Sequence, residues 1–310
     1  MPSRAEAAPL GGRLQGVIPP LVTPFLADGR LDLAAFEANL EAFADEDFTG
    51  YLVLGSNGEA GSLEEDEKLA LVGVARARAG SRLLLAGTGL ESTRATVALT
   101  RKAAERGADA VLVLTPCFYK SRMTPEALAR HFEAVAEASP VPVLLYSVPS
   151  FTGLPWPPGL AAVLSAHPSV AGMKESSGDV GLLERIVSSV PPSFQVLCGS
   201  GPVFYPALCL GAVGGVLAVA NCAPGAVTAL FRAFAAGDHA GARRLQAALN
   251  PLASAVTSIH GIAGLKAAMD LAGFRGGSVR APLLGVPQSV RDELRPLLDR
   301  ARAGVATASG

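Results

Sequence analysis

Lys174 is the residue of this sequence with the clearest capacity for chemistry. It follows the apolar run 169–173 and precedes Glu175 and a Ser-Ser-Gly turn. A short apolar run bounded by turn residues is typical of a buried strand, where an ammonium ion is unfavourable unless it is paired or loses its proton. A neutral lysine amine attacks carbonyl carbons, which is the first step of Schiff-base catalysis. The alternative is a lysine whose charged end reaches solvent at the end of the strand.

Polar residues follow the other apolar runs in the same way. These positions carry hydroxyls, amides, glycines and one tyrosine, and they are Thr23, 55–59, 87–89, Thr115, 146–147, 174–176, 199–201 and Asn221. Histidines and aspartates do not cluster among them, so we expect no metal site. The ring of groups therefore surrounds one lysine, Lys174, and one tyrosine, Tyr146.

The remaining candidates have structural explanations. We expect His131, His167 and His239 on helix or loop surfaces and leave His260 open. Lys266 is expected to be structural, and Glu59 to lie on the surface or to cap a helix, with a supporting role behind the site residues as the alternative for Glu59. The four cysteines lack Cys-x-x-Cys spacing, which favours reduced thiols in a cytosolic protein.

Eight apolar runs of strand length alternate with amphipathic segments. The runs are 16–22, 50–55, 82–87, 110–115, 141–148, 170–174, 195–199 and 214–220. The amphipathic segments include 33–45, 64–79, 92–106 and 125–138. Strands that are apolar on both faces, each followed by a helix, indicate parallel pairing in a closed (β/α)8 TIM barrel, an α/β fold. A doubly wound open sheet is the alternative.

The barrel would position the polar groups, because its active face lies at the carboxyl ends of the strands. We expect the barrel to span residues 14–225. Residues 226–305 are predicted to form a C-terminal helical extension. Helix starts are indicated by Asp32, by Ser92 or Thr93, and by Thr124 before Pro125.

Composition excludes several classes of function. The chain has 310 residues, is 50% hydrophobic and has a net charge of -1, which argues against nucleic acid or an anionic membrane surface as the main partner. No uninterrupted apolar stretch reaches the roughly 20 residues of a membrane span. Residues 1–10 lack the apolar core of a signal peptide, so we expect a cytoplasmic protein.

Three strings of residues resemble those of a known family. They are Gly-Ser-Asn-Gly-Glu at 55–59, Leu-Tyr-Ser-Val-Pro at 145–149 and Gly-Met-Lys-Glu-Ser at 172–176. They resemble the lysine-dependent pyruvate aldolases, which include dihydrodipicolinate synthase and N-acetylneuraminate lyase. The resemblance covers about residues 16–284. Within this family, segments such as 83–87, 115–117 and 211–215 are most similar to 4-hydroxy-2-oxoglutarate aldolases.

The resemblance implies a mechanism without a metal or other cofactor. Lys174 would form a Schiff base with a 2-oxo acid, and retro-aldol cleavage of 4-hydroxy-2-oxoglutarate would yield glyoxylate and pyruvate. Tyr146 would carry the proton, with Ser56 as its hydroxyl partner. Ser56 and Asn57 would also bind the substrate carboxylate, although on their own these residues favour an ordinary turn between strand and helix.

Departures from the family pattern bear on the substrate. Where dihydrodipicolinate synthases carry an arginine in Pro-Ser-Arg-Thr-Gly, this chain has Phe151, which cannot bind a carboxylate. The resemblance places the hydroxyl of Ser176 near the distal carboxylate. We also expect Gly199 and Val216, in the seventh and eighth predicted strands, to contact the substrate.

A second departure concerns the proton relay. The resemblance implies a tyrosine from a neighbouring subunit at the position of Phe118, so the relay would use water or Tyr119, or be shorter. Aromatic packing between subunits is the alternative role for both residues. The resemblance also implies a homo-oligomer, a tetramer in its relatives.

Two classes of function follow. The first is a class I aldolase for 4-hydroxy-2-oxoglutarate or, as alternatives, a dihydrodipicolinate synthase or a 2-keto-3-deoxy sugar acid aldolase. The second is a barrel that binds 2-oxo acids without turnover. The joint presence of Lys174 and Tyr146 favours the first, because a binding protein needs no nucleophile.

Overall fold

The computed structural model describes residues 10–308. Residues 1–9, on which most of the argument against a signal peptide depends, lie outside this range. No helix in the described part of the chain is long and apolar enough to cross a membrane.

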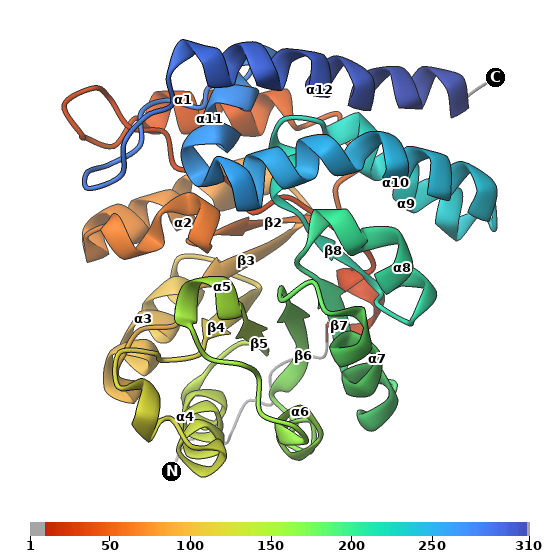
Figure 1. Cartoon of the computed structure of the whole chain (residues 1–310). Coiled ribbons are helices and arrows are strands. Elements are labelled where there is room, and N and C mark those ends of the chain that lie inside the picture. Colours follow the sequence, from red (N-terminus) through yellow and green to blue (C-terminus); the bar gives the residue numbers. More distant parts are fainter. Residues whose placement is uncertain (1–9, 309–310) are drawn as a thin grey trace.

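Eight parallel strands form one sheet within the described residues. They are β1 (Gly16–Ile18), β2 (Gly50–Val53), β3 (Leu83–Gly87), β4 (Ala110–Leu114), β5 (Val143–Ser147), β6 (Val170–Glu175), β7 (Gln195–Cys198) and β8 (Gly214–Val216). Their order is β1-β8-β7-β6-β5-β4-β3-β2, and a parallel bridge between Pro20 and Leu52 joins the two ends. The predicted (β/α)8 barrel is thus confirmed (Figure 1).

The apolar runs form strands because both of their faces are buried. On β5, Val143 and Leu145 belong to the core between sheet and helices, whereas Leu144 and Tyr146 belong to the core inside the barrel. On β6, Met173 faces the outer core. Because side chains alternate along a strand, Lys174 points into the barrel beside Tyr146.

Helices surround the sheet. The α-helices are α1 (Leu33–Ala42), α2 (Glu65–Ala79), α3 (Thr93–Glu105), α4 (Pro125–Ala138), α5 (Pro149–Thr152), α6 (Leu160–Leu164), α7 (Val180–Ser189), α8 (Phe204–Cys209), α9 (Pro224–Ala235), α10 (His239–Ser254), α11 (Gly261–Ala272) and α12 (Gln288–Ala308). The 3₁₀-helices are η1 (Gly11–Leu14), η2 (Ser56–Gly58), η3 (Ala60–Ser62), η4 (Lys120–Arg122), η5 (Gly201–Val203) and η6 (Ala218–Asn221), and η7 (Ala255–Ile259) is a π-helix. The side chains of Asp32, Ser92 and Thr124 accept hydrogen bonds from the first turns of α1, α3 and α4, so the predicted helix starts are confirmed.

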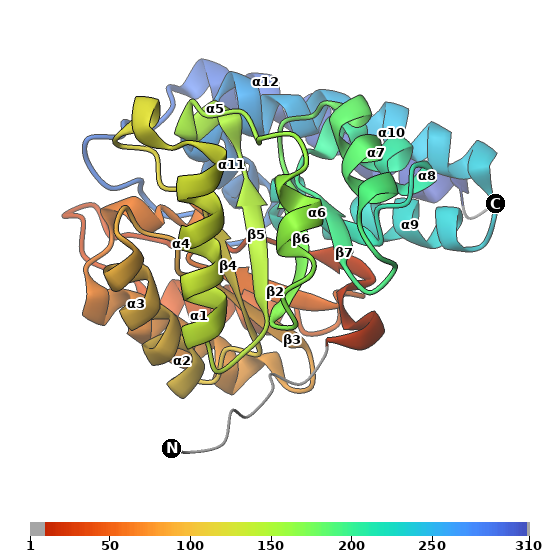
Figure 2. The ribbon, with the colours of Figure 1, turned by 90° about the horizontal axis from the view of Figure 1, so that it is seen from below.

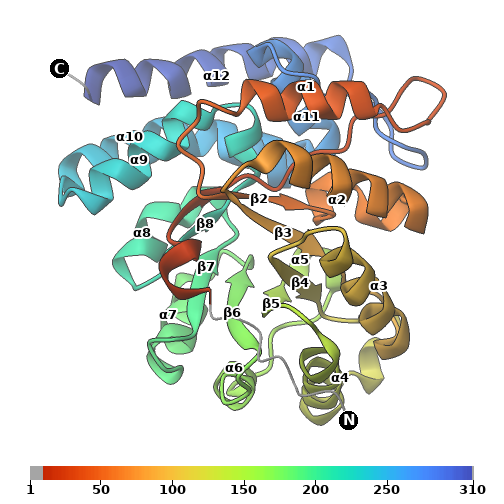
Figure 3. The same cartoon turned by 180° about the vertical axis from the view of Figure 1, so that it is seen from behind.

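The last helices cover one side of the barrel. In Figure 1 and Figure 3, α12 runs along the outside of α10 and α11, which it contacts. Figure 2 shows β5 pointing toward the side where α5 and α11 lie. Helix α9 contains the boundary predicted near residue 225 and packs against both β1 and α10, so this boundary stays a prediction.

Candidate active site

Lys174 lies at the carboxyl end of β6, directly opposite Tyr146 on β5. Its side chain is almost fully buried, with 3% of the residue exposed, and its Nζ lies 4.2 Å from the centre of the Tyr146 ring. A cation over an aromatic face is stabilised by the ring quadrupole, and a neutral amine in the same place is free to react. The strand pairing therefore brings the predicted nucleophile and the predicted proton carrier together.

The hydroxyl of Tyr146 contacts Ser56, which comes from η2 after the second strand. The distance between the two hydroxyl oxygens is 3.3 Å. The main-chain carbonyl of Tyr146 accepts a hydrogen bond from Thr115 Oγ1 at 3.2 Å, which ties the end of β5 to the end of β4. The Tyr146 hydroxyl thus has Ser56 as a partner, and a phenol held in this way is suited to take up and return a proton.

A cavity of about 730 Å³ opens at this end of the barrel. Its lining combines predicted site residues with residues from the helices that follow the barrel. It consists of Asn57, Tyr146, Val148, Ser150, Phe151, Lys174, Ser176, Ser177, Gly199, Ser200, Gly201, Pro202, Ala218, Thr257, Ser258, His260, Gly261, Ile262, Ala263, Leu283 and Leu284. Lys174 is the one lysine or arginine of this lining.

Gly199 leaves room for the two residues that would meet the substrate. A Cβ on Gly199 would lie 1.8 Å from Ser176 Oγ and 2.9 Å from Lys174 Cε. Ser176 Oγ is buried and has no hydrogen-bond partner within the described chain. An unpaired buried hydroxyl is costly, which makes it a good candidate to bind a ligand.

Other predicted site residues lie away from the cavity. Val216 is buried and belongs to the core inside the barrel, so its contact with substrate stays a prediction. Phe118 and Tyr119 are 75% and 67% exposed, and neither lines the cavity. Their rings pack edge to face at 5.0 Å.

Glu175 follows Lys174 but points to the other face of β6. It is buried, and its carboxylate accepts a hydrogen bond from the Ser177 N–H at 2.8 Å. Burial raises the pKa of Glu175, although the bonds from Ser177 oppose this. Beside it on β7, burial raises the pKa of the Cys198 thiol to about 12, so this cysteine is not a nucleophile at neutral pH.

One part of the cavity wall was not predicted from the sequence, and it comes from the C-terminal part of the chain. Thr257 and Ser258 lie on the π-helix η7, and His260 follows it. His260 Nε2 lies 3.2 Å from Glu293 of α12. A π-helix widens the helical turn and is frequent at functional sites. The adjacent hydroxyls of Thr257 and Ser258 are visible in the sequence, but no pattern in the neighbouring residues predicts that they lie next to the barrel.

Two sequence predictions were wrong. His131 is buried, not on the surface, because it lies on the face of α4 that packs inward; its Nδ1 lies 2.9 Å from Thr93 Oγ1. Burial lowers the pKa of His131 to about 4, against the opposing charge of Glu91. Glu59 is also buried, at 4% exposed, because it forms an ion pair with Lys266.

Together the fold and the site define a (β/α)8 barrel with a single lysine in the cavity at the carboxyl ends of its strands. The profile of the Dihydrodipicolinate synthetase family matches residues 13–301. The chain therefore belongs to this family. The members of the family are class I aldolases and lyases, which supports assigning this chain to the same broad class of enzyme.

Individual relatives agree with this assignment. A 4-hydroxy-tetrahydrodipicolinate synthase of an Exiguobacterium species is 37% identical over 283 residues, which cover 91% of this chain and 95% of the relative. The solved structure of the 4-hydroxy-tetrahydrodipicolinate synthase from Methylacidiphilum fumariolicum SolV has a TM-score of 0.89 at 30% identity, covering 95% of this chain and 98% of that one. YagE of Escherichia coli K12, a prophage protein solved in complex with pyruvate, has a TM-score of 0.87 at 30% identity, covering 93% and 98%.

Proposed function

We propose that this protein is a pyruvate-dependent class I aldolase in which Lys174 forms a Schiff base with a 2-oxo acid. One observation carries the proposal. A buried lysine in a cavity faces Tyr146, whose hydroxyl contacts Ser56. YagE, a relative of the same fold, was solved in complex with pyruvate, and this supports pyruvate as the oxo acid.

The chemistry follows from these groups. The Lys174 amine adds to the C2 ketone, and loss of water gives a protonated imine. In the cleavage direction Tyr146 accepts the proton of the C4 hydroxyl, the C3–C4 bond breaks, and its electron pair passes into the imine to form an enamine. The aldehyde leaves, Tyr146 returns the proton to C3 of the enamine, and water hydrolyses the imine to release pyruvate and the free amine. The synthetic direction uses the same steps in reverse.

The loop of η2 is suited to the carboxylate of the pyruvyl portion. Asn57 lines the cavity, whereas Ser56 is not among its lining residues but contacts the lining residue Tyr146. Hydroxyl and amide donors from a turn bind a carboxylate without adding a second charge. This binding would orient C2 toward Lys174.

Different observations favour different aldehydes. The names of the relatives favour 4-hydroxy-tetrahydrodipicolinate synthesis over the cleavage of 4-hydroxy-2-oxoglutarate predicted from the sequence. The cavity argues against the synthase reaction, since Phe151, which cannot bind a carboxylate, lines it where the resemblance implies an arginine in the synthases. The 4-hydroxy-2-oxoglutarate reaction is supported by the unpaired hydroxyl of Ser176, which is available to a distal carboxylate.

A specific observation favours the third candidate, a 2-keto-3-deoxy sugar acid. The lining of the cavity also carries hydroxyls from Ser200, Thr257 and Ser258, together with the imidazole of His260. Uncharged donors and acceptors of this kind match the hydroxyls of a sugar chain better than a carboxylate.

Borohydride trapping tests the chemistry common to all three. We expect pyruvate and borohydride to add a pyruvyl group to Lys174, as located by intact mass and peptide mapping. Lys174→Ala should lose the adduct and remain folded, whereas Lys102→Ala, at an exposed lysine, should keep it. A folded wild-type protein without an adduct would refute the aldolase and favour a barrel that binds oxo acids without turnover.

Product assays then separate the substrates. Glyoxylate release identifies 4-hydroxy-2-oxoglutarate cleavage, formation of 4-hydroxy-tetrahydrodipicolinate identifies the synthase, and pyruvate release from a 2-keto-3-deoxy sugar acid identifies the third activity.

We further propose that the protein is cytoplasmic and that it forms a homo-oligomer. The homo-oligomer is supported by the exposed aromatic pair of Phe118 and Tyr119, which is suited to a contact between subunits.

A further inference from the structure

The loop formed by η2 is bounded by two residues with unusual backbone conformations. Leu54 precedes it with φ 58° and Glu59 follows it with φ 53°, and both are buried. Non-glycine residues in the left-handed region are strained and persist where their surroundings hold them, often at functional sites. The contacts that hold Glu59 therefore also fix the end of the loop.

Glu59 is held by an ion pair with Lys266 of α11. Lys266 Nζ lies 2.5 Å from Glu59 Oε1, and it donates two further hydrogen bonds, to the carbonyls of Thr23 at 2.7 Å and Ser278 at 2.6 Å. The ammonium group thus interacts with one carboxylate and two carbonyl groups. Burial lowers the pKa of Lys266, and the charge of Glu59 opposes this. Such a pair is stable only while both partners are present.

Thr23 gives Lys266 a second connection to the loop. The hydroxyl of Thr23 donates to the carbonyl of Gly58 at 2.7 Å, while its own carbonyl accepts from Lys266. Lys266 thus contacts Glu59 directly and Gly58 through one residue. A helix beyond the barrel anchors the loop at two consecutive positions.

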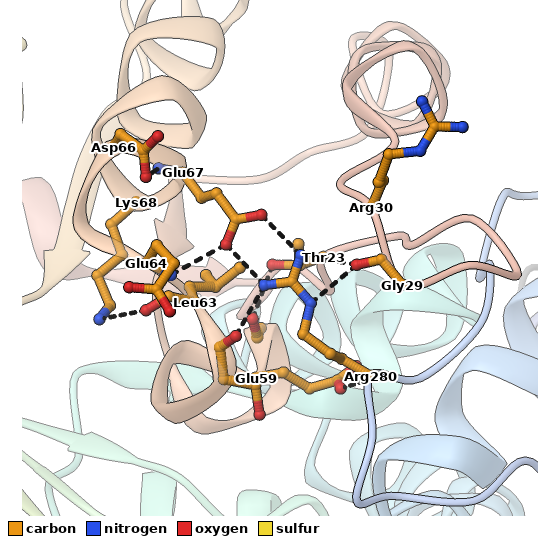
Figure 4. A network of polar contacts seen from close by, with 12 residues as sticks. Thr23, Gly29, Arg30, Glu59, Leu63, Glu64, Asp66, Glu67, Lys68 and Arg280 are labelled. Carbon is orange, nitrogen blue, oxygen red and sulfur yellow. Dashed lines mark hydrogen bonds and ion pairs between the residues drawn. The ribbon is translucent and has the colours of Figure 1, made fainter.

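Arg280 completes the network (Figure 4). Its backbone N–H donates to Glu59 Oε2 at 2.9 Å, and its guanidinium binds both oxygens of Glu67 at 2.6 Å. The same guanidinium donates to the carbonyls of Gly29 and Ser62. Both oxygens of Glu59 are therefore held by residues that follow the barrel in the chain.

We propose that the Glu59–Lys266 pair positions the η2 loop for binding of the substrate carboxylate, an inference that rests on the proposed function. Neither residue lines the cavity, so neither touches the substrate. They act on Ser56 and Asn57, which lie between the two strained residues Leu54 and Glu59. Both are positioning residues rather than catalytic ones.

The test measures two quantities for each variant, its thermal stability and the pyruvate concentration that half-saturates the trapping reaction. The variants are Glu59→Gln, Lys266→Met and the double variant, in which no unpaired charge is buried. Asn39→Ala is the matched control, because buried Asn39 ties the same C-terminal segment to α1 through two bonds with Arg275 but makes none to the loop. Each protein is measured for thermal unfolding and for the pyruvate concentration that gives half-maximal borohydride trapping on Lys174.

We expect each single variant to raise that concentration at least tenfold, with a smaller effect on the limiting trapping rate. The double variant should recover stability relative to the single variants but keep the raised concentration, because it lacks the tether. Wild-type saturation in the double variant would overturn the inference, as would an equal rise in Asn39→Ala. If a single variant does not fold, the double variant decides. Absence of an adduct in folded wild-type protein would instead refute the proposed function, and the inference with it.

Discussion

Replacing Gly199 by alanine should impair the site through the space that the glycine leaves empty. The new Cβ would lie 1.8 Å from Ser176 Oγ, 2.8 Å from Ser176 Cβ and 2.9 Å from Lys174 Cε. Ordinary contact begins near 3.4 Å. Lys174 must therefore move by about 0.5 Å, and Ser176 by more, if the backbone stays in place.

The size of the effect follows from two separate costs. Overpacking a buried site costs roughly 1–3 kcal/mol of folding stability. Misplacing a reacting group by about 1 Å lowers a rate by about 100-fold, so a shift of half that size should lower the rate of imine formation by about 10-fold. We expect slower borohydride trapping of pyruvate on Lys174 together with a lower midpoint of thermal unfolding.

Two further variants separate these costs. Gly73→Ala is the matched control, because Gly73 lies in α2 and a methyl group there would have nothing within 4 Å, so both measurements should stay unchanged or stability should rise slightly. Adding Ser176→Ala to Gly199→Ala removes the shortest contact but keeps the one with Lys174. Trapping should remain slow in this double variant. A Gly199→Ala protein that traps pyruvate at the wild-type rate would refute the packing argument.

Two other predictions concern Tyr146 and His131. Tyr146→Phe removes the hydroxyl that contacts Ser56 and should lower kcat by about 10²-fold or more while Lys174 can still be trapped with pyruvate; an unchanged kcat would exclude Tyr146 as proton carrier. The pKa of His131 falls from 6.5 to about 4 on folding, so the unfolded chain binds the proton first and stability is lost as the pH drops from 6.5 to 4. The loss should approach about 3 kcal/mol and be absent in His131→Asn, as measured by denaturant unfolding at pH 7 and pH 4.5; an equal loss in the variant would contradict this assignment.

The barrel and its central pair could be predicted because their signals are local. Each strand is apolar on both faces, and this produces short apolar runs that end in polar residues. Lys174 was recognisable because it ends such a run, and the family resemblance singled out Tyr146 on the preceding run; parallel pairing then brings the two side by side. The burial of His131 also had a local signal. It lies between Leu128 and Phe132, which form the buried stripe of α4, so helical periodicity was sufficient to place it inward.

The remainder of the site depends on contacts between distant parts of the sequence. The conformations of Leu54 and Glu59 are not favoured by their residue types, and Glu59 is polar enough to be expected on the surface. Its burial makes sense only when Lys266, from the far end of the chain, supplies the opposite charge. Likewise, the C-terminal segment contributes Thr257 and Ser258 to the cavity wall. The helices that follow the barrel in the sequence therefore belong to the site in two ways. They form part of the cavity wall, and through Lys266 they hold the η2 loop.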